Sequence, residues 1–292
     1  MLDHFEEIVY PAFFDQRIRE YGSTKYFFSE VNLVYLGEDD QARPLVGIAG
    51  RFIKDGEISR EQIYKNGVLV KNSRKMQSSP SSIFLLILHN HRLVYVREMA
   101  GAPDKASFRS TLLTFLKSAR DENIKARFEE VDNEYSTRKD RREKKDEIYD
   151  EYQVPSLQVI PLASHGSVVD FIEKYDVLRQ VKITYRATND ENPMGDFFTL
   201  LKASKEALGS DKAVVVQEAK KGLDKSEAAS QITAAAGQGI NSVDLRGTDD
   251  AGDTLVGNND SFQLKKPIEG LSSDPAEAAE ALFESFRELG NL

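Results

Sequence analysis

Residues 240–255 read INSVDLRGTDDAGDTL, and this stretch decides the fold that we expect for the C-terminal half of the chain. Val243 and Leu245 alternate with polar residues, which is typical of a strand with one buried side and one solvent-facing side. Residues 249–252 are turn formers and include a glycine that can adopt a positive φ. Residues 253–256 can return as the partner strand, so we predict a β-hairpin.

Arg246 is the one cation on the outward side of this predicted hairpin, and aspartates surround it in the sequence. An arginine in this setting has two interpretations. It pairs with Asp244 or Asp249 in a structural ion pair, or the rigid strand holds it ready to bind an anion. The pattern alone leaves both interpretations open.

The composition predicts a soluble globular protein with a hydrophobic core. Of the 292 residues, 40% are hydrophobic and 30% are charged, which excludes a disordered chain. The chain has no cysteine, which excludes disulfides, thiolate metal sites and a cysteine nucleophile. The N-terminal residues MLDHFEEIVY lack the features of a signal peptide. No apolar run approaches the ~20 residues of a membrane helix, so we expect a cytoplasmic location.

The net charge of −9 argues against nucleic-acid binding by the chain as a whole, because phosphates require local positive potential. The charge is unevenly distributed, however. From Asp244 to the end there are 11 acidic and 4 basic residues, a net charge of −7. The rest of the chain is therefore closer to balance, and a local basic surface stays possible there.

The order of elements predicts two domains of the α+β class. We place an N-terminal α+β domain at residues 1–127, a charged connector at 128–154 and a C-terminal α+β domain at 155–292. The C-terminal domain is expected to end in the hairpin of residues 240–255 and a last, capping helix. We expect mixed or antiparallel sheets with helices packed on one face.

In the N-terminal domain the clearest element is a hairpin at residues 83–99, IFLLILHNHRLVYVREM. His89 and His91 stand at its turn without a nearby carboxylate, so we interpret them as solvated turn residues and not as metal ligands. The other predictions for this domain are a helix over residues 1 to about 30, strands over 25–36 and 44–52, a strand or short helix over 61–70, a polar loop over 71–82 and a helix over 107–117.

The connector contains a dense block of charge, with ten acidic and six basic residues between Glu129 and Glu151. Three interpretations are open. The block is a solvated helix with ion pairs four residues apart, a mobile linker, or a basic tract that contacts phosphates. Acidic residues on both sides of the basic tract weaken the third interpretation.

The C-terminal domain alternates strands and helices. Predicted strands cover residues 157–162, 178–186 and 213–217, and the valines of the last are expected to be buried. Predicted helices cover 169–175, 193–208 with Asn192 as N-cap, 225–236, and the segment that starts at Asp274–Pro275 with Asp274 as N-cap. In the strand at 178–186, Lys182 and Arg186 face away from Val181 and Ile183. This strand therefore presents a cationic outward side.

The common catalytic motifs are missing, and one weak nuclease-like fragment remains. Asp211, the strand that follows it, and then Glu218 and Lys220 resemble the PD-(D/E)xK pattern, in which carboxylates hold Mg²⁺ and the lysine assists the attacking water. Asp211 precedes the same strand, whereas the nuclease family places its aspartate on a preceding one. We expect a protein that is not an enzyme and has no cofactor or metal, with a Mg²⁺ nuclease as an alternative.

The segment DLRGTDDAGDTL resembles the RexA-like family of phage-exclusion proteins, in which a strand with a central arginine enters an acidic turn that ends in Ala-Gly-Asp. The preceding elements are also similar, namely SSIFLLILHNHRLVYVREM, LQVIPL and NPMGDFFTLL. The similarity covers roughly residues 80–118 and 155–267. It implies a two-domain fold similar to that of the recombination-associated protein RdgC.

The resemblance also implies a function, namely dimeric, sequence-nonspecific binding of double-stranded DNA in the exclusion of superinfecting phage, with a RexB-like membrane protein as partner. Arg246 matches the arginine of the family hairpin, whereas Thr248 stands where the family has a second cation. We expect Arg246, Lys182 and Arg186 to form one DNA-binding patch if their strands are neighbours. Four more cations could extend it: Lys220, Lys221, Lys265 and Lys266. The further alternative is an acidic protein–protein interaction module.

Overall fold

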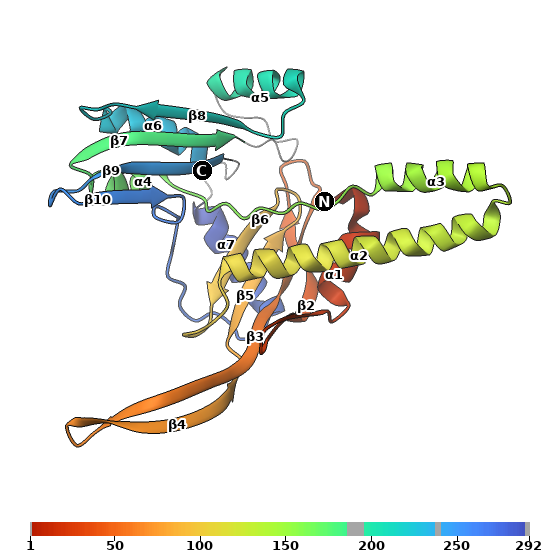
Figure 1. Ribbon diagram of the computed structural model, residues 1–292, viewed down its shortest axis with the longest axis horizontal. Helices are drawn as coiled ribbons and strands as arrows, with labels where there is room; N and C mark the ends of the chain where they lie inside the picture. The colour runs from red at the N-terminus through yellow and green to blue at the C-terminus, as the bar shows by residue number, and fades with distance from the viewer. Residues whose placement is uncertain (1, 186–195, 237–240, 290–292) are drawn as a thin grey trace. The chain divides into compact units, whose positions relative to one another are not determined.

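The computed structural model describes residues 2–185, 196–236 and 241–289 (Figure 1). The chain is of the α+β class, and its strands pair antiparallel. It divides into two compact units. The first comprises residues 1–159 and 269–289, and the second is built around residues 160–268.

The first unit is built on an antiparallel sheet with the strand order β1-β2-β3-β5-β6, and β4 pairs with β3 outside this path. Its strands are β1 (Ile18–Tyr21), β2 (Thr24–Glu38), β3 (Pro44–Lys65), β4 (Val68–Ser78), β5 (Ser81–Ile87) and β6 (Arg92–Arg97). Every residue of β5 is buried, as its continuous apolar sequence predicts for a central strand. The predicted hairpin of residues 83–99 is confirmed by the pairing of β5 with β6.

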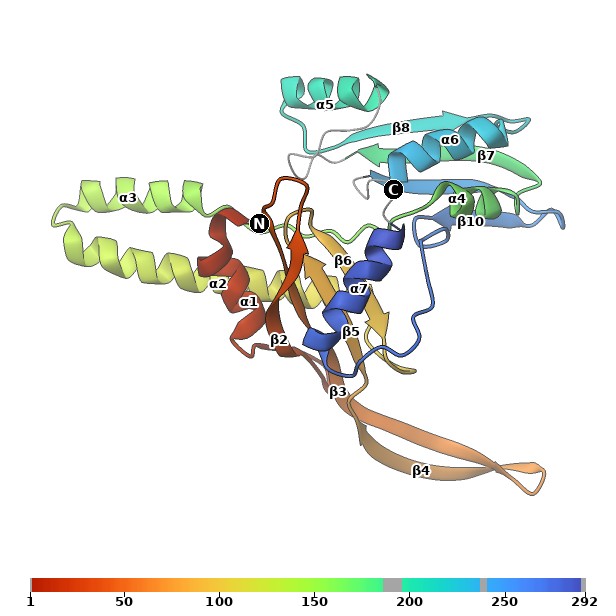
Figure 2. The ribbon, with the colours of Figure 1, turned by 180° about the vertical axis from the view of Figure 1, so that it is seen from behind.

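Helices cover both faces of this sheet (Figure 2). On one face pack η1 (Leu2–His4), η2 (Phe5–Val9), α1 (Tyr10–Phe14) and α2 (Lys105–Glu134). Phe28, Phe52, Phe84 and Phe108 form an aromatic cluster in this layer, with ring centroids 5.2–5.6 Å apart. Such offset and edge-to-face contacts add to the free energy gained from burying the rings.

The opposite face of the sheet is covered by α7 (Pro275–Leu289), which contacts β2, β3, β5 and β6. The sequence predicted this helix correctly, with Asp274 as its N-cap: the Asp274 carboxylate accepts a hydrogen bond of 2.7 Å from the Ala276 amide. Its assignment to the C-terminal domain is wrong, because Ala278, Ala279 and Leu282 are buried against the first unit's sheet. The apolar residues along one side of α7 predict that the helix packs on a sheet, but they do not specify which sheet.

The charged block at 129–151 forms the end of α2 and a second helix, α3 (Arg138–Glu151), which together make a helical hairpin. No residue of α3 is buried. Ion pairs four residues apart, Lys139–Glu143 and Arg142–Asp146, lie along it, and Lys145 pairs with Asp132 of α2 at 2.7 Å. The block therefore matches the first of its three interpretations, a solvated helix with ion pairs four residues apart.

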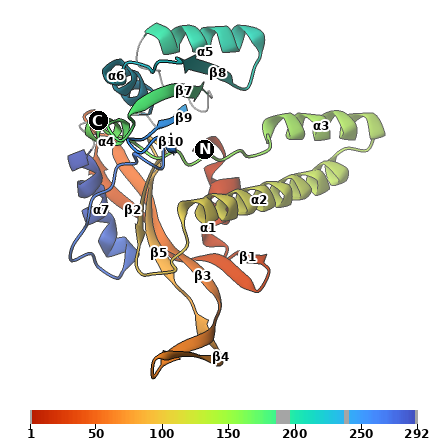
Figure 3. The ribbon, with the colours of Figure 1, turned by 60° about the vertical axis from the view of Figure 1, so that its left-hand side comes forward.

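The second unit is a four-stranded sheet in the order β10-β9-β7-β8 with two helices on one face (Figure 3). Its strands are β7 (Val177–Tyr185), β8 (Ala213–Glu218), β9 (Asn241–Thr248) and β10 (Thr254–Asn258). Its helices are α4 (His165–Ile172), α5 (Asp196–Leu208) and α6 (Lys225–Ala236). The hairpin predicted at residues 240–255 is confirmed by the pairing of β9 with β10.

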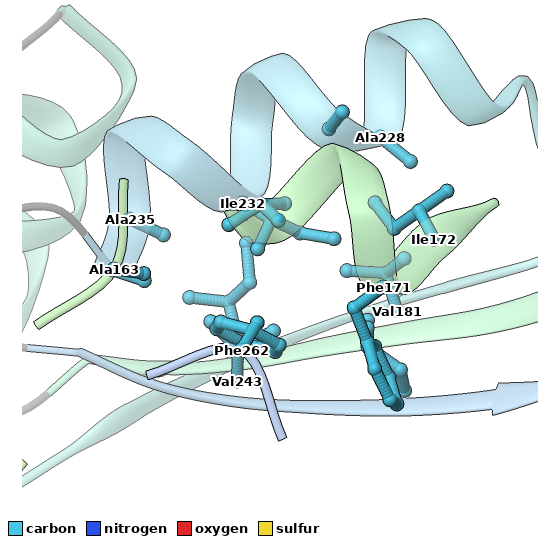
Figure 4. Close-up of a cluster of buried hydrophobic side chains, with 14 of the residues drawn as sticks. Ala163, Phe171, Ile172, Val181, Ala228, Ile232, Ala235, Val243 and Phe262 are labelled. Carbon is cyan, nitrogen blue, oxygen red and sulfur yellow. The ribbon is translucent and has the colours of Figure 1, made fainter. Parts of the chain in front are cut away.

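The core of the second unit lies between α4, α6 and the inner face of the sheet (Figure 4). Val181 of β7, Val243 and Leu245 of β9, and Ile232 of α6 are almost fully buried there. Their alternation with exposed residues along each strand is the pattern from which the sequence predicted them. Burial raises the pKa of Tyr175 in this core to about 12, so its phenol stays protonated at neutral pH.

Four local predictions are wrong. The helix expected to reach residue 30 ends at Phe14, and β1 and β2 follow. The loop expected at 71–82 lies largely within β4. Residues 157–162 form no strand. The predicted buried valine strand is the edge strand β8, with Val214 and Val216 exposed by 45% and 48%. The N-cap predicted at Asn192 lies outside the described residues.

The close approach of β9 to β7 requires a glycine at position 247. A Cβ atom there would lie 2.1 Å from the Val177 carbonyl oxygen and 2.7 Å from the Tyr175 ring. We predict that Gly247→Ala lowers the free energy of unfolding by at least about 2 kcal/mol, measured by urea denaturation followed by far-UV circular dichroism. Gly166→Ala is the control, because its Cβ would meet nothing closer than 4.0 Å. Equal stability of the two variants would contradict the close approach.

Candidate nucleic-acid interface

The outward face of the second unit's sheet carries two of the cations that the sequence singled out. In the register of the strands, Arg246 of β9 stands opposite Gln180 of β7, and Gln180 stands opposite Glu218 of β8. One row further along, Asp244 stands opposite Lys182. Directly opposed residues share a face, so both cations and both carboxylates lie on this side of the sheet.

Lys182 is neutralised by a neighbour. Its Nζ lies 3.2 Å from the Asp244 carboxylate, in a half-exposed ion pair. Arg246 takes neither of the two partners weighed from the sequence, and in the described part of the chain no carboxylate pairs with it. Asp249 instead stabilises the turn, since its carboxylate accepts hydrogen bonds from the amides of Ala251 and Asp253.

The charges on this face balance one another, so the face is not positively charged. Glu218 accepts a hydrogen bond from Gln180 and lies two strands from Arg246, about 10 Å away at the usual strand spacing. The face therefore carries two cations and two carboxylates, which sum to no net charge. A net-neutral surface gives little of the counterion release that drives phosphate binding.

The other predicted cations do not join this face. Lys220 and Lys221 are exposed in the turn that follows β8. Lys265 and Lys266 follow Phe262, whose ring packs beside Phe171 of α4 and whose carbonyl accepts a hydrogen bond from Ser167, also of α4. That segment thus runs on the helix-covered side of the sheet. Arg186 lies outside the described residues.

The nuclease-like fragment is not assembled into a metal site. Glu218 is engaged with Gln180, and Lys220 is exposed beyond the end of the strand. Over residues 2–185, 196–236 and 241–289, no group of three or more histidine and carboxylate side chains is arranged to hold a metal ion.

A second surface, which the sequence reading missed, is a two-stranded arm in the first unit. We call residues 56–78 the β-arm. Strand β3 pairs with β5 only as far as Ile53 and with β2 only as far as Asp55, and beyond that point it pairs with β4 alone. The ribbon projects from the sheet by roughly 30 Å, from the rise per residue of a strand (Figures 1 and 3).

The β-arm is positively charged in an acidic chain. It contains five basic and two acidic residues, a net charge of +3, whereas the whole chain has a net charge of −9. The five basic residues are Arg60, Lys65, Lys71, Arg74 and Lys75. The arm is thus a local cationic element of the kind that phosphate binding requires.

The strand register separates the charges onto two faces. In the register, Lys71 stands opposite Gln62 and position 74 stands opposite position 60. A bulge between these two pairs brings Lys71 and Arg74, three residues apart in β4, to one side of the ribbon, which we call the basic face. Both glutamates of the arm occupy the intervening positions, 57 and 61, on the opposite side. There Glu57 pairs with Lys75 at 2.9 Å. The basic face has no acidic residue.

The exposed cations of this face are available for a ligand. Lys71 and Arg74 are exposed, and within the described chain neither has an ion-pair partner. The arm is held at its base by Asp55, whose carboxylate accepts hydrogen bonds from Ser79 at 2.6 Å and Gln77 at 2.8 Å. These bonds lower the pKa of Asp55, so it stays ionised at neutral pH.

The turn at the tip carries the signal that would have revealed the arm. Asn66 and Gly67 have φ angles of 51° and 82°, the positive values that a two-residue type I′ hairpin requires. Asn-Gly between strand-like residues is the strongest short-range sequence signal for a hairpin. The sequence reading instead treated 61–70 as one segment and 71–82 as a loop.

Comparison of the sequence with protein-family models and with curated proteins gives no match. Within the described residues, no helix is both long enough and apolar enough to cross a membrane.

We predict that the tip of the β-arm stays structured only if its turn can adopt positive φ angles. Gly67→Val places a β-branched residue at a φ of 82°, which should fray the tip while the rest of the first unit stays folded. We expect faster tryptic cleavage after Lys65 and Lys71, with an unchanged melting temperature. Asn66→Gly, which keeps positive φ accessible, is the control and should be cleaved as slowly as the parent. Equal protection of all three proteins would contradict the turn assignment.

Proposed function

We propose that this protein binds double-stranded DNA without sequence preference and that the basic face of the β-arm is its contact surface. The observation that carries the proposal is the separation of charge on the arm. Lys71 and Arg74 share one face that lacks acidic residues, in a chain that is otherwise strongly acidic. Such a surface attracts a polyanion, while the remaining surface repels it.

The dimensions of the arm suit a duplex. A two-stranded ribbon fits the major groove of B-DNA, which is about 12 Å wide. Along about 30 Å of ribbon, the cations of the basic face can reach phosphates on the groove walls. With roughly three phosphate contacts per chain, the logarithm of the affinity should fall with the logarithm of the salt concentration with a slope of about −3.

This proposal moves the DNA contact away from the residues that the sequence favoured. Arg246 and Lys182 lie on a charge-balanced face, and Lys182 is already paired with Asp244. Non-catalytic DNA binding in phage exclusion, an RdgC-like two-domain arrangement, a homodimer, a RexB-like membrane partner and a cytoplasmic location are proposed on the family resemblance of the sequence.

Reversing charge on the basic face should abolish most of the binding. We predict that Lys71→Glu with Arg74→Glu weakens binding to a labelled duplex by about tenfold or more and reduces the magnitude of the salt slope by about 2. Fluorescence anisotropy across a salt series without Mg²⁺ measures both quantities. Two duplexes of unrelated sequence should bind the parent equally.

The control for this experiment is Lys182→Glu with Arg246→Glu, which makes the same change in net charge on the second unit's sheet. We expect it to bind within about threefold of the parent, because only long-range repulsion changes. If this variant loses binding and the arm variant keeps it, the contact lies where the sequence first placed it. The arm assignment is then wrong.

The nuclease alternative predicts a different result. Plasmid incubated with the protein and Mg²⁺ should stay intact, because Glu218 and Lys220 do not form part of a carboxylate cluster in the described chain. Agarose electrophoresis reads the outcome. Cleavage that disappears in Glu218→Ala would replace the proposed function with an enzymatic one.

A further inference from the structure

The tip of the β-arm exposes large apolar side chains. Tyr64 of β3 stands directly opposite Leu69 of β4, and the two are exposed by 74% and 68%. Val68 and Val70, on the opposite face of the tip, are exposed by 58% and 42%. A two-stranded ribbon is marginally stable alone, and an apolar group of this kind at its end marks a surface that a partner covers.

The position of this pair relative to the cations indicates the partner. Tyr64 and Leu69 occupy the same face of the ribbon as Lys71, two residues beyond Leu69, and as Arg74 beyond the bulge. A ligand that lies along this face therefore meets phosphate-binding groups on the stem and an apolar pair at the tip. In a duplex, the groove walls are charged and the base edges are polar. Apart from the thymine methyl groups, the apolar surfaces are the stacked faces of the bases.

We propose that Tyr64 and Leu69 insert between base pairs and bend the duplex that the basic face holds. This inference rests on the proposed DNA binding and adds a structural consequence to it. Base faces become accessible only when a step is unstacked. Architectural proteins of the minor groove unstack steps with apolar wedges and kink DNA by 20–90°, and the tip of the arm is placed to do the same from the groove that the ribbon occupies. No sequence-specific contact is needed, which agrees with binding that ignores sequence.

The distribution of charge favours DNA over a lipid surface. Apolar groups of peripheral proteins enter a bilayer by about 5–10 Å, and useful cations lie at that level. Lys71, two residues from Leu69, would suit either surface, but Arg74 stands level with position 60, four residues from Tyr64 and about 13 Å along the ribbon. A cation so far from the tip would contribute little at a headgroup layer, whereas it is well placed for a phosphate further along a groove.

The test measures bending and binding separately. A duplex of about 30 base pairs, labelled with a donor at one end and an acceptor at the other, is titrated with the full-length protein. We expect energy transfer to rise on binding of the parent. Tyr64→Ala with Leu69→Ala should remove this rise while the affinity stays within about threefold and the salt slope is unchanged, because the phosphate contacts remain.

The matched control is Ile58→Ala with Met76→Ala, an opposed apolar pair on the same face at the base of the arm, exposed by 53% and 66%. This variant should bend DNA as the parent does. The wedge is wrong if the parent binds without bending, or if the tip variant bends DNA fully. Two further results would contradict the wedge. If the tip variant differs from the parent only in its mass by light scattering, the tip is a contact between copies of the chain. If it differs only in capture by vesicles of phosphatidylserine and phosphatidylcholine, the tip binds lipid. Failure of the parent to bind any duplex overturns the proposed function itself.

Discussion

Strand β3 is the constraint on which the first unit depends, because one continuous strand serves two environments. Its first part lies between β2 and β5 and carries Ile48 and Phe52 into the core. Its second part has β4 as its only partner in the described chain and is exposed on both faces. The packed sheet fixes the direction in which the strand leaves it, so the arm continues the sheet as a paired ribbon and is not a loop.

The two units use the same kind of sheet differently. In the first unit helices pack on both faces of the sheet, and the arm and the helical hairpin of α2 and α3 extend beyond these layers. In the second unit α4 and α6 cover one face, and on the outer face Lys182 is paired with Asp244. An ion pair such as Lys182–Asp244 on a half-exposed surface contributes little stability and also removes a cation from potential ligand contact.

Sequence patterns predicted the elements whose burial is periodic. The run of apolar residues in β5, the alternation around Val243 and Leu245, and the bounds of α6 all follow from one buried side. The β-arm was missed because a ribbon exposed on both faces has no such alternation, and KNSRKMQS reads as a loop. Non-local packing was also invisible: nothing in the stripe of α7 specifies the sheet it covers. The candidate site shifted for this reason, from Arg246 to Lys71 and Arg74.

The most direct test of the arm as the DNA contact is site-specific photocrosslinking, which the absence of cysteine makes possible without background. A photoreactive group is attached to a single cysteine introduced by Ser73→Cys in the arm or by Val256→Cys, whose position lies opposite Arg246 in the strand register. If the β-arm is the contact surface, we predict that a labelled duplex crosslinks to the Ser73→Cys protein and not to the Val256→Cys protein. Crosslinking only to the Val256→Cys protein would contradict the β-arm as the DNA contact.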